Sequence, residues 1–248
     1  MKKDAGKIAL VTGANRGIGF EIARQIAQSG AHVLLSGRSF EHANIAAQTL
    51  CDQKLIATPI QLDVTDPESV SHAADWIAST FGRLDILVNN AAIRIEDYGI
   101  APSGQPMWKW RETFETNLFG VVEVTQALLS LIRNSKAGRI VNVSSLLGSV
   151  GTHSDRSSYA YSDMFKSLPA YSASKCGVNS WTAHLAYELR DTPIKVNAVH
   201  PGYTKTDMND GLGDLEIPEG ARTSVQMALL GSNGPSGSYV HLDRIIPW

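Results

Sequence analysis

The chain has 248 residues, of which 43% are hydrophobic and 19% are charged, with 22 Lys and Arg residues against 24 Asp and Glu residues. The apolar fraction is high enough to form a buried core and excludes a disordered chain, while a formal net charge of −2 excludes a strongly basic surface for nucleic acid. The apolar run at residues 8–11 is too short for a signal peptide, and no run is long enough to cross a membrane. We therefore expect a cytoplasmic protein with no nucleic-acid or membrane partner.

Short apolar runs alternate with longer amphipathic stretches along the whole chain. The expected strands are residues 7–11, 32–36, 56–62, 84–88, 139–143, 194–199 and 238–241. The expected helices are residues 18–29, 43–50, 66–81, 111–133 and 171–190. This alternation predicts a Rossmann-type, doubly wound α/β fold, with about seven parallel strands and helices on both faces. We expect residues 92–110, 146–170 and 203–222 to be irregular and to carry function.

A glycine-rich segment, residues 12–19, lies between the first expected strand and the first expected helix. Its glycines would let the backbone approach a pyrophosphate, which the free N–H groups at the start of the helix would bind. The spacing is G-x-x-x-G-x-G, which differs from the common G-x-G-x-x-G pattern of dinucleotide sites. The expected cofactor contacts in this segment are Gly13, Asn15, Arg16, Gly17, Ile18 and Gly19.

The end of the second expected strand indicates which dinucleotide is bound. Proteins that prefer NAD(H) have an acidic residue there, which binds the 2′-hydroxyl of the ribose. Here the position is followed by Arg38, and Arg16 lies in the glycine-rich segment. A guanidinium offers two donors that match a phosphate, so the pair predicts NADP(H) rather than NAD(H). The alternative is that both arginines are merely exposed.

Tyr171 and Lys175 are four residues apart in an expected helix, so they share one face of it. A nearby ammonium favours the phenolate and lowers the pKa of a tyrosine, which suits it for acid/base chemistry. The same spacing also occurs on ordinary helix surfaces. However, neighbouring strands end in Asn89–Ala91 and in Ser144 and Ser145, at the edge where doubly wound sheets bind ligands.

Together these motifs resemble those of the short-chain dehydrogenase/reductase family. The matching segments are Thr12–Gly19, Asp63 and Val64, Asn89–Ala91, Asn117, Ser145, Tyr171, Lys175, and Pro201 and Gly202. Residues 112–117, 199–208 and 218–221 and the C-terminal Pro247 and Trp248 further resemble the carbonyl-reductase branch, which prefers NADPH. The resemblance implies a single domain over residues 1–248, with a dinucleotide-binding part at about 7–150 and a substrate loop at about 203–222.

The resemblance also implies roles for individual residues. Tyr171 would exchange the proton with the carbonyl oxygen, and Lys175 would bind the ribose hydroxyls and lower the pKa of Tyr171. Ser145, rather than Ser144, would bind the substrate oxygen, and Asn117 would support a water relay to Lys175. Besides the glycine-rich segment and Arg38, the cofactor would contact Asp63, Val64, Asn90, Ala91, Tyr171, Lys175, Pro201, Gly202, Thr204 and Thr206.

The interval between Ser145 and Tyr171 is about twice as long as in most of the family. The additional residues, about 151–168, would shape the substrate pocket or cover the helix face through which many relatives associate. The third interpretation is a tolerated surface loop, because lengthening a loop adds little to the entropic cost of closing it. We therefore leave open whether the chain is a monomer or a homo-oligomer, dimer or tetramer.

These observations predict an NADPH-dependent oxidoreductase that transfers a hydride to an aldehyde, ketone or quinone, its small-molecule substrate. One alternative is a 3-oxoacyl-carrier reductase, for which only Lys109 and Arg111 offer a basic docking patch. Another is a non-catalytic NADP(H)-binding regulatory protein, although the Tyr171–Lys175 pair is intact. The two cysteines and the scattered histidines lack the spacing of metal ligands, so we expect no metal.

Overall fold

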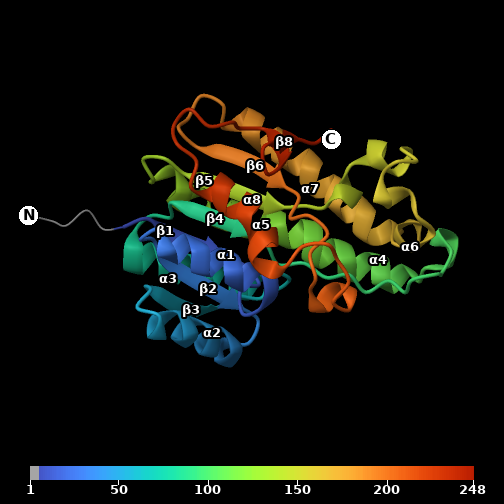
Figure 1. Ribbon diagram of the computed structural model, residues 1–248. Helices are drawn as coiled ribbons and strands as arrows, with labels where there is room; N and C mark the ends of the chain where they lie inside the picture. The colour runs from blue at the N-terminus through green and yellow to red at the C-terminus, as the bar shows by residue number, and fades with distance from the viewer. Residues whose placement is uncertain (1–5) are drawn as a thin grey trace, which may run out of the picture.

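The computed structural model describes residues 6–248, and in that part of the chain eight strands form one sheet. The strands are β1 (Ile8–Val11), β2 (His32–Gly37), β3 (Ala57–Gln61), β4 (Ile86–Asn89), β5 (Arg139–Val143), β6 (Lys195–Val199), β7 (Ser238–His241) and β8 (Arg244–Ile245). Their order is β3-β2-β1-β4-β5-β6-β7-β8, and only β8 is antiparallel to its neighbour. The doubly wound α/β fold is confirmed (Figure 1).

Helices cover both faces of the sheet. They are α1 (Gly17–Gln28), α2 (Phe40–Asp52), α3 (Pro67–Phe81), α4 (Met107–Phe114), α5 (Gly120–Arg133), α6 (Asp163–Lys166), α7 (Pro169–Glu188) and α8 (Ile217–Ala228). One apolar core joins α1, α2 and α8 to the sheet, and a second joins α3, α5 and α7 to the opposite face (Figure 1). Strand β1 shows why: Ala9 and Val11 enter the first core, whereas Ile8 and Leu10 enter the second, because side chains alternate along a strand.

Several boundaries differ from the expectations. Residues 203–222 were expected to be irregular, but α8 begins at Ile217. The expected helix at 111–133 begins earlier, at Met107, and a π-helical turn at Glu115–Phe119 divides it into α4 and α5. The sheet has the two-residue strand β8 in addition to the expected seven. Residues 146–170 contain several short helices, among them α6, and the first turn of α7.

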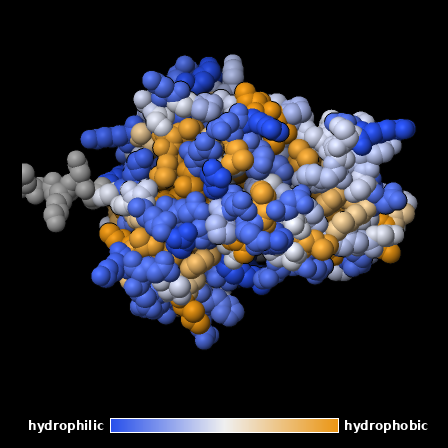
Figure 2. Space-filling model, viewed as in Figure 1, coloured by the Kyte–Doolittle hydropathy of each residue, from blue (hydrophilic) through white to orange (hydrophobic). Residues whose placement is uncertain are grey.

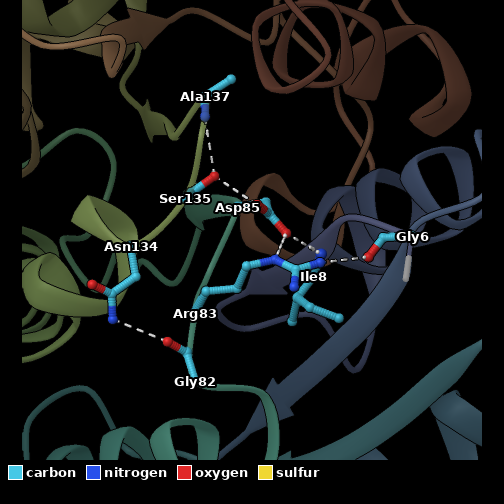
Figure 3. A network of polar contacts seen from close by, with 8 residues as sticks. All are labelled: Gly6, Ile8, Gly82, Arg83, Asp85, Asn134, Ser135 and Ala137. Carbon is cyan, nitrogen blue, oxygen red and sulfur yellow. Dashed lines mark hydrogen bonds and ion pairs between the residues drawn. The ribbon is translucent and has the colours of Figure 1, made fainter. Parts of the chain in front are cut away.

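A polar network occupies the amino end of the central strands (Figure 3). The carboxylate of Asp85, the residue before β4, accepts hydrogen bonds from Ile8 N at 2.9 Å, Arg83 Nε at 3.1 Å and Ser135 Oγ at 2.5 Å. The network thus joins the starts of β1 and β4 to the turn before β5. Nearby, Asn134 donates to the Gly82 carbonyl at 3.0 Å. These contacts lie at the opposite edge from the carboxyl ends of the strands.

The face of the molecule seen in Figure 2 is mainly hydrophilic, and its apolar side chains lie in separate groups. Two apolar side chains of α4, Met107 and Trp108, are more than half exposed at 60% and 52%. Among residues 6–248, no helix has the length and apolar character needed to span a membrane.

Candidate active site

A cavity of about 630 Å³ opens at the carboxyl edge of the sheet. Its wall is formed by the segments that follow β1, β2, β3, β4, β5 and β6, together with α7. Fifteen of the residues predicted from the sequence line it: Gly13, Asn15, Arg16, Gly17, Ile18, Gly19, Arg38, Asp63, Val64, Asn90, Ala91, Tyr171, Lys175, Pro201 and Thr206. Elements distant in sequence therefore contribute to one site.

The glycine-rich segment leaves the start of α1 open toward this cavity. Helix α1 has no side-chain hydrogen bond at its N-terminus, so its first N–H groups are available to an anion. Gly17 has a φ of +60°, and a Cβ there would meet nothing within 4 Å. At Gly19, by contrast, a Cβ would lie 2.4 Å from the Asn90 amide nitrogen and 2.5 Å from the Gly13 carbonyl oxygen. The segment therefore needs glycine both for its turn and for its close packing.

Arg16 and Arg38 lie together beside the mouth of the cavity. Both also line an adjoining hollow that contains Ser39 and His42. Arg16 Nη1 is 3.2 Å from Asp207 Oδ2, with both side chains more than 70% exposed. Two guanidinium groups are therefore accessible to a ligand beside the end of β2, and the Asp207 carboxylate contacts one of them.

The side chains of Tyr171, Lys175 and Ser145 meet at the carboxyl end of β5. Tyr171 and Lys175 lie one turn apart on α7, and the Lys175 Nζ is 5.8 Å from the centre of the Tyr171 ring. Lys175 Nζ donates to the carbonyl of Val143, the last residue of β5, at 2.8 Å. The Ser145 side chain is hydrogen-bonded to that of Tyr171. The structure thus brings together a phenol, an ammonium and a hydroxyl beside the cavity.

Burial dominates the protonation of this group. It raises the pKa of Tyr171 to about 12, while the Ser145 hydrogen bond and the charge of Arg94 act in the opposite direction. Burial also lowers the pKa of Lys175 to about 8. Both shifts follow from removing the charged form from water. In this structure the pKa of Tyr171 is therefore above its ordinary value, and not below it as the sequence suggested.

The backbone around Ser145 is held by buried side chains from other elements. The Tyr239 hydroxyl, on β7, donates to the Ser145 carbonyl. His200 Nδ1 accepts from Leu146 N at 3.2 Å, and burial lowers the pKa of His200 to about 3. A neutral imidazole is required for that acceptor role. The sequence drew attention to neither contact, because the partners are more than 50 residues apart.

Four predicted residues do not line the cavity. The Asn117 side chain, fully buried in the π-helical turn, binds the backbone of Ile93 and the Ser174 hydroxyl. Thr204 is buried against Gly220, and Gly202 lies beside Leu215. The fourth is Ser145, which contacts Tyr171, while the cavity wall includes the neighbouring Ser144.

The inserted residues pack beside Tyr171. Tyr159, Phe165 and Leu168 share an apolar cluster with Tyr171 and Tyr203. The Tyr159 and Tyr203 rings are stacked with centroids 5.8 Å apart, and Phe165 meets Tyr203 edge-on at 5.4 Å. The insertion thus contributes to the surroundings of the candidate site, as expected if it shapes the substrate pocket; its role stays a prediction.

The sequence analysis missed part of the cavity wall. The additional residues include Ile93, Arg94, Ile95, Glu112, Glu115, Thr116, Asp207 and Met208. Arg94 crosses the site, because its guanidinium donates to the Met208 carbonyl at 2.6 and 2.9 Å. Residues 93–95 follow the end of β4, and no spacing signal marks them. The others lie within segments 112–117 and 199–208, for which the resemblance gave these residues no role. Among residues 6–248, no group of three or more His, Cys, Asp or Glu side chains is arranged to bind a metal ion.

Comparisons with known proteins agree with this geometry. The family model described as short chain dehydrogenase matches residues 7–216. (+)-Neomenthol dehydrogenase of Arabidopsis thaliana is 35% identical, and the match covers 96% of this chain and 97% of that protein. The structure of salutaridine reductase from Papaver somniferum has a TM-score of 0.79 at 31% identity and covers 94% of this chain and 99% of that one.

A second structure is similar in fold over nearly the whole chain. A variant of actinorhodin polyketide ketoreductase, determined with NADPH, has a TM-score of 0.81 at 26% identity and covers 97% of each chain. The family match, the extent of these similarities and the shared fold lead to one conclusion. This chain belongs to the short-chain dehydrogenase/reductase family of oxidoreductases, whose members use nicotinamide cofactors.

Proposed function

We propose that this protein is an NADPH-dependent reductase of aldehydes, ketones or quinones. The observation that carries the proposal is the arrangement of one cavity. The open start of α1 lies on its wall at one place, and Tyr171, Lys175 and Ser145 meet at another. An anion-binding helix end and a proton donor in one cavity are what a dinucleotide-dependent reductase requires.

The residues present fit a bound dinucleotide. The N–H groups at the start of α1 and the backbone of Gly17 would hold the pyrophosphate, since both are free of side-chain contacts. Asp63 and Val64 would contact the adenine, and Pro201 and Thr206 the nicotinamide amide. Asn90 and Ala91 would line the path between the ribose and the nicotinamide. When bound, NADPH would supply the hydride.

The chain's own residues would orient the substrate and supply the proton. Ser145 would bind the carbonyl oxygen, and the Tyr171 hydroxyl would donate its proton to that oxygen as it becomes an alcohol. Because burial raises the pKa of Tyr171 to about 12, the phenol carries its proton at neutral pH, which is the form that can donate in the reduction. Lys175 has ammonium donors left after its bond to Val143, and they would bind the ribose hydroxyls.

The preference for NADPH over NADH rests on Arg16 and Arg38. Two exposed guanidinium groups at the end of β2 suit a 2′-phosphate, and the structure determined with NADPH is a related protein. Arg38→Asp should shift the NADPH/NADH ratio of kcat/KM toward NADH by at least about tenfold, because a carboxylate repels the phosphate. An unchanged ratio would assign the preference to other residues.

A carrier-bound 3-oxoacyl substrate is less favoured by the surface near the site. The basic docking patch suggested by the sequence consists of Lys109 and Arg111. Lys109 is only 7% exposed, and its ammonium is paired with Asp97 at 2.5 Å. That pairing leaves little free positive charge for a carrier. The cytoplasmic location stays a prediction, and the oligomeric state stays open.

The direct test is a panel of aldehydes, ketones, quinones and one carrier-bound 3-oxoacyl thioester, with NADPH oxidation followed by absorbance. We expect turnover with free carbonyls and its loss by about 1,000-fold in Tyr171→Phe, with NADPH binding retained. The matched control is Tyr187→Phe, on the same helix but 69% exposed, which should keep full activity. Turnover retained in Tyr171→Phe would exclude Tyr171 as the proton donor. NADPH binding with no turnover on any substrate would favour a regulatory protein.

A further inference from the structure

Helix α7, which carries Tyr171 and Lys175, begins without a local cap. Its first residue is Pro169, which has no N–H group, and the preceding Leu168 provides no side-chain hydrogen bond. The N–H of Leu168 bonds to the Phe165 carbonyl at 3.2 Å. The N–H groups of Ala170 and Tyr171 then have no carbonyl available within the helix. A buried helix start requires another partner for both of them.

Glu96 supplies that partner from a different part of the chain. Its Oε1 accepts from Ala170 N at 2.6 Å and its Oε2 accepts from Tyr171 N at 2.8 Å. Glu96 is 3% exposed. Burial raises the pKa of its carboxyl, while the two N–H groups and the charges of Arg94 and Lys109 act in the opposite direction. A carboxylate at a helix start is further stabilised by the helix dipole.

The loop that holds Glu96 is itself fixed at several points. Arg94 Nη1 donates to the Glu96 carbonyl at 3.1 Å, and the same guanidinium binds the Met208 carbonyl across the cavity. The Gln105 amide nitrogen donates to the carbonyls of Asp97 and Ser167, both at 2.9 Å. These hydrogen bonds fix the backbone on both sides of Glu96, so its carboxylate is held in place. It connects the cavity wall after β4 to the first turn of α7.

We propose that Glu96 is a positioning residue for Tyr171. By holding two successive N–H groups, one of them that of Tyr171 itself, it sets the height and rotation of the first turn of α7 relative to the cavity. The Tyr171 hydroxyl is thereby held beside Ser145 for proton transfer. The inference rests on the proposed function of Tyr171 and adds a residue that the motif spacing does not mark.

The test compares Glu96→Gln and Glu96→Ala with the wild-type protein. Glutamine keeps one acceptor, but its amide N–H₂ faces a backbone N–H, whereas alanine removes both acceptors. We expect faster hydrogen exchange at the Ala170 and Tyr171 amides in both variants. We also expect kcat to fall by about 10- to 100-fold, because a small displacement of the proton donor is enough. The NADPH Kd should stay within about twofold, since Glu96 lies outside the cofactor contacts.

The matched control is Asp97→Asn, the neighbouring carboxylate on the same loop. Asp97 pairs with Lys109 and makes no hydrogen bond to α7 among the described residues. It should leave kcat and the exchange of the α7 amides unchanged. The kcat values and exchange rates are compared well below each variant's Tm, so that a general loss of stability does not change them.

Two results would overturn the inference. One is a Glu96 variant with wild-type kcat; the other is a loss of kcat that Asp97→Asn reproduces or that a weaker NADPH Kd accompanies. A wild-type protein without turnover would contradict the proposed function instead. In that case hydrogen exchange at the Ala170 and Tyr171 amides would still test the role of Glu96. Unchanged exchange in Glu96→Ala would show that Glu96 does not hold the first turn of α7.

Discussion

Two buried cations lie at the two ends of strand β5, and their surroundings differ. Arg139, the first residue of β5, is 2% exposed, and so is Lys175, which bonds to the last residue of the same strand. Burial lowers the pKa of both groups. Neither cation forms an ion pair with a carboxylate among residues 6–248. Their different roles must therefore come from what their N–H donors contact.

Arg139 uses its donors completely. Its guanidinium makes five hydrogen bonds to backbone carbonyls, at 2.7 to 3.2 Å, and a guanidinium has five N–H groups. The acceptors include Leu230 and Gly231 after α8 and Pro193 before β6. Among residues 6–248, the Lys175 ammonium makes one hydrogen bond, to the Val143 carbonyl at 2.8 Å, and the rest of the ammonium faces the cavity. A cation with all donors satisfied fixes the fold, whereas one with donors to spare can bind a ligand.

The same contrast holds for the acids at the two edges. Asp85, at the amino edge, accepts from three groups that belong to three parts of the chain (Figure 3). Asp207, beside the cavity mouth, has one exposed contact with Arg16. The Asp85 carboxylate is thus engaged by its neighbours within the fold, whereas the Asp207 carboxylate remains accessible. Variants at the two edges should therefore affect different properties.

Lys175→Met should have the largest effect, and on activity alone. Removing the ammonium takes away the donors for the ribose and a cation 5.8 Å from the centre of the Tyr171 ring, so we expect kcat/KM for carbonyl reduction to fall by about 1,000-fold. The free energy of unfolding should be unchanged or higher, because the buried charge is not paired. Steady-state kinetics and urea unfolding of the same preparation measure both. A large loss of stability in Lys175→Met would show that Lys175, like Arg139, stabilises the fold, and would contradict the difference in role between the two cations.

Arg139→Met should give the reverse result. It leaves the carbonyls of Leu230, Gly231 and Pro193 without these donors, which we expect to lower the free energy of unfolding by about 4 kcal/mol. The kcat of the folded variant should stay within about twofold of wild type, because the cavity is at the other edge. Urea unfolding gives the first quantity and kinetics below the Tm the second. A strong decrease in kcat would connect the amino edge to catalysis.

The pH dependence of stability provides a test without substrate. Burial lowers the pKa of Lys175 to about 8 from its ordinary 10.5, so between these values the unfolded chain binds a proton that the folded chain does not. Stability therefore rises with pH across this window, by up to about 3 kcal/mol on an order-of-magnitude basis.

The measurement is the difference between wild type and Lys175→Met in urea unfolding at pH 8, 9 and 10. Subtracting the variant removes the contributions of the tyrosines and cysteines that titrate in the same range. We expect the free energy of unfolding of the wild type, minus that of Lys175→Met, to increase as the pH rises. A difference that is constant with pH would mean that Lys175 keeps its ordinary pKa in the folded protein.

The carboxyl edge was only partly predictable from the sequence. The glycine-rich segment and the Tyr171–Lys175 pair depend on spacing within one loop or one helix, so they can be recognised from the sequence. Glu96 and Tyr239 act on backbone groups 74 to 94 residues away. No local pattern marks such a contact, because the fold alone brings the partners together.

Helix α8 shows why one element was missed. Residues 203–222 were expected to be irregular, yet α8 has Pro218 in its first turn, where Pro is favoured. Gly220 is required for packing rather than for a turn, because a Cβ there would lie 2.3 Å from Thr204 Oγ1.

Strand β8 has only two residues, 244–245, too few for an alternating pattern. Strands such as β1 and β4 were predicted because they are buried apolar runs.

Asp85→Asn should have the smallest effect of those considered, and it tests the amino-edge network directly. The asparagine can keep its carbonyl oxygen toward Ile8 N and Arg83 Nε and turn its N–H₂ group toward the Ser135 hydroxyl, which can accept. The negative charge that strengthens the hydrogen bonds from Ile8 N and Arg83 Nε is lost. We expect the free energy of unfolding to fall by about 2 kcal/mol, with kcat unchanged. The matched control is Asp207→Asn, whose ion pair with Arg16 is exposed and should contribute less than about 0.5 kcal/mol. Equal losses in the two variants, measured by urea unfolding, would show that burial of the network adds nothing to the stability of the sheet.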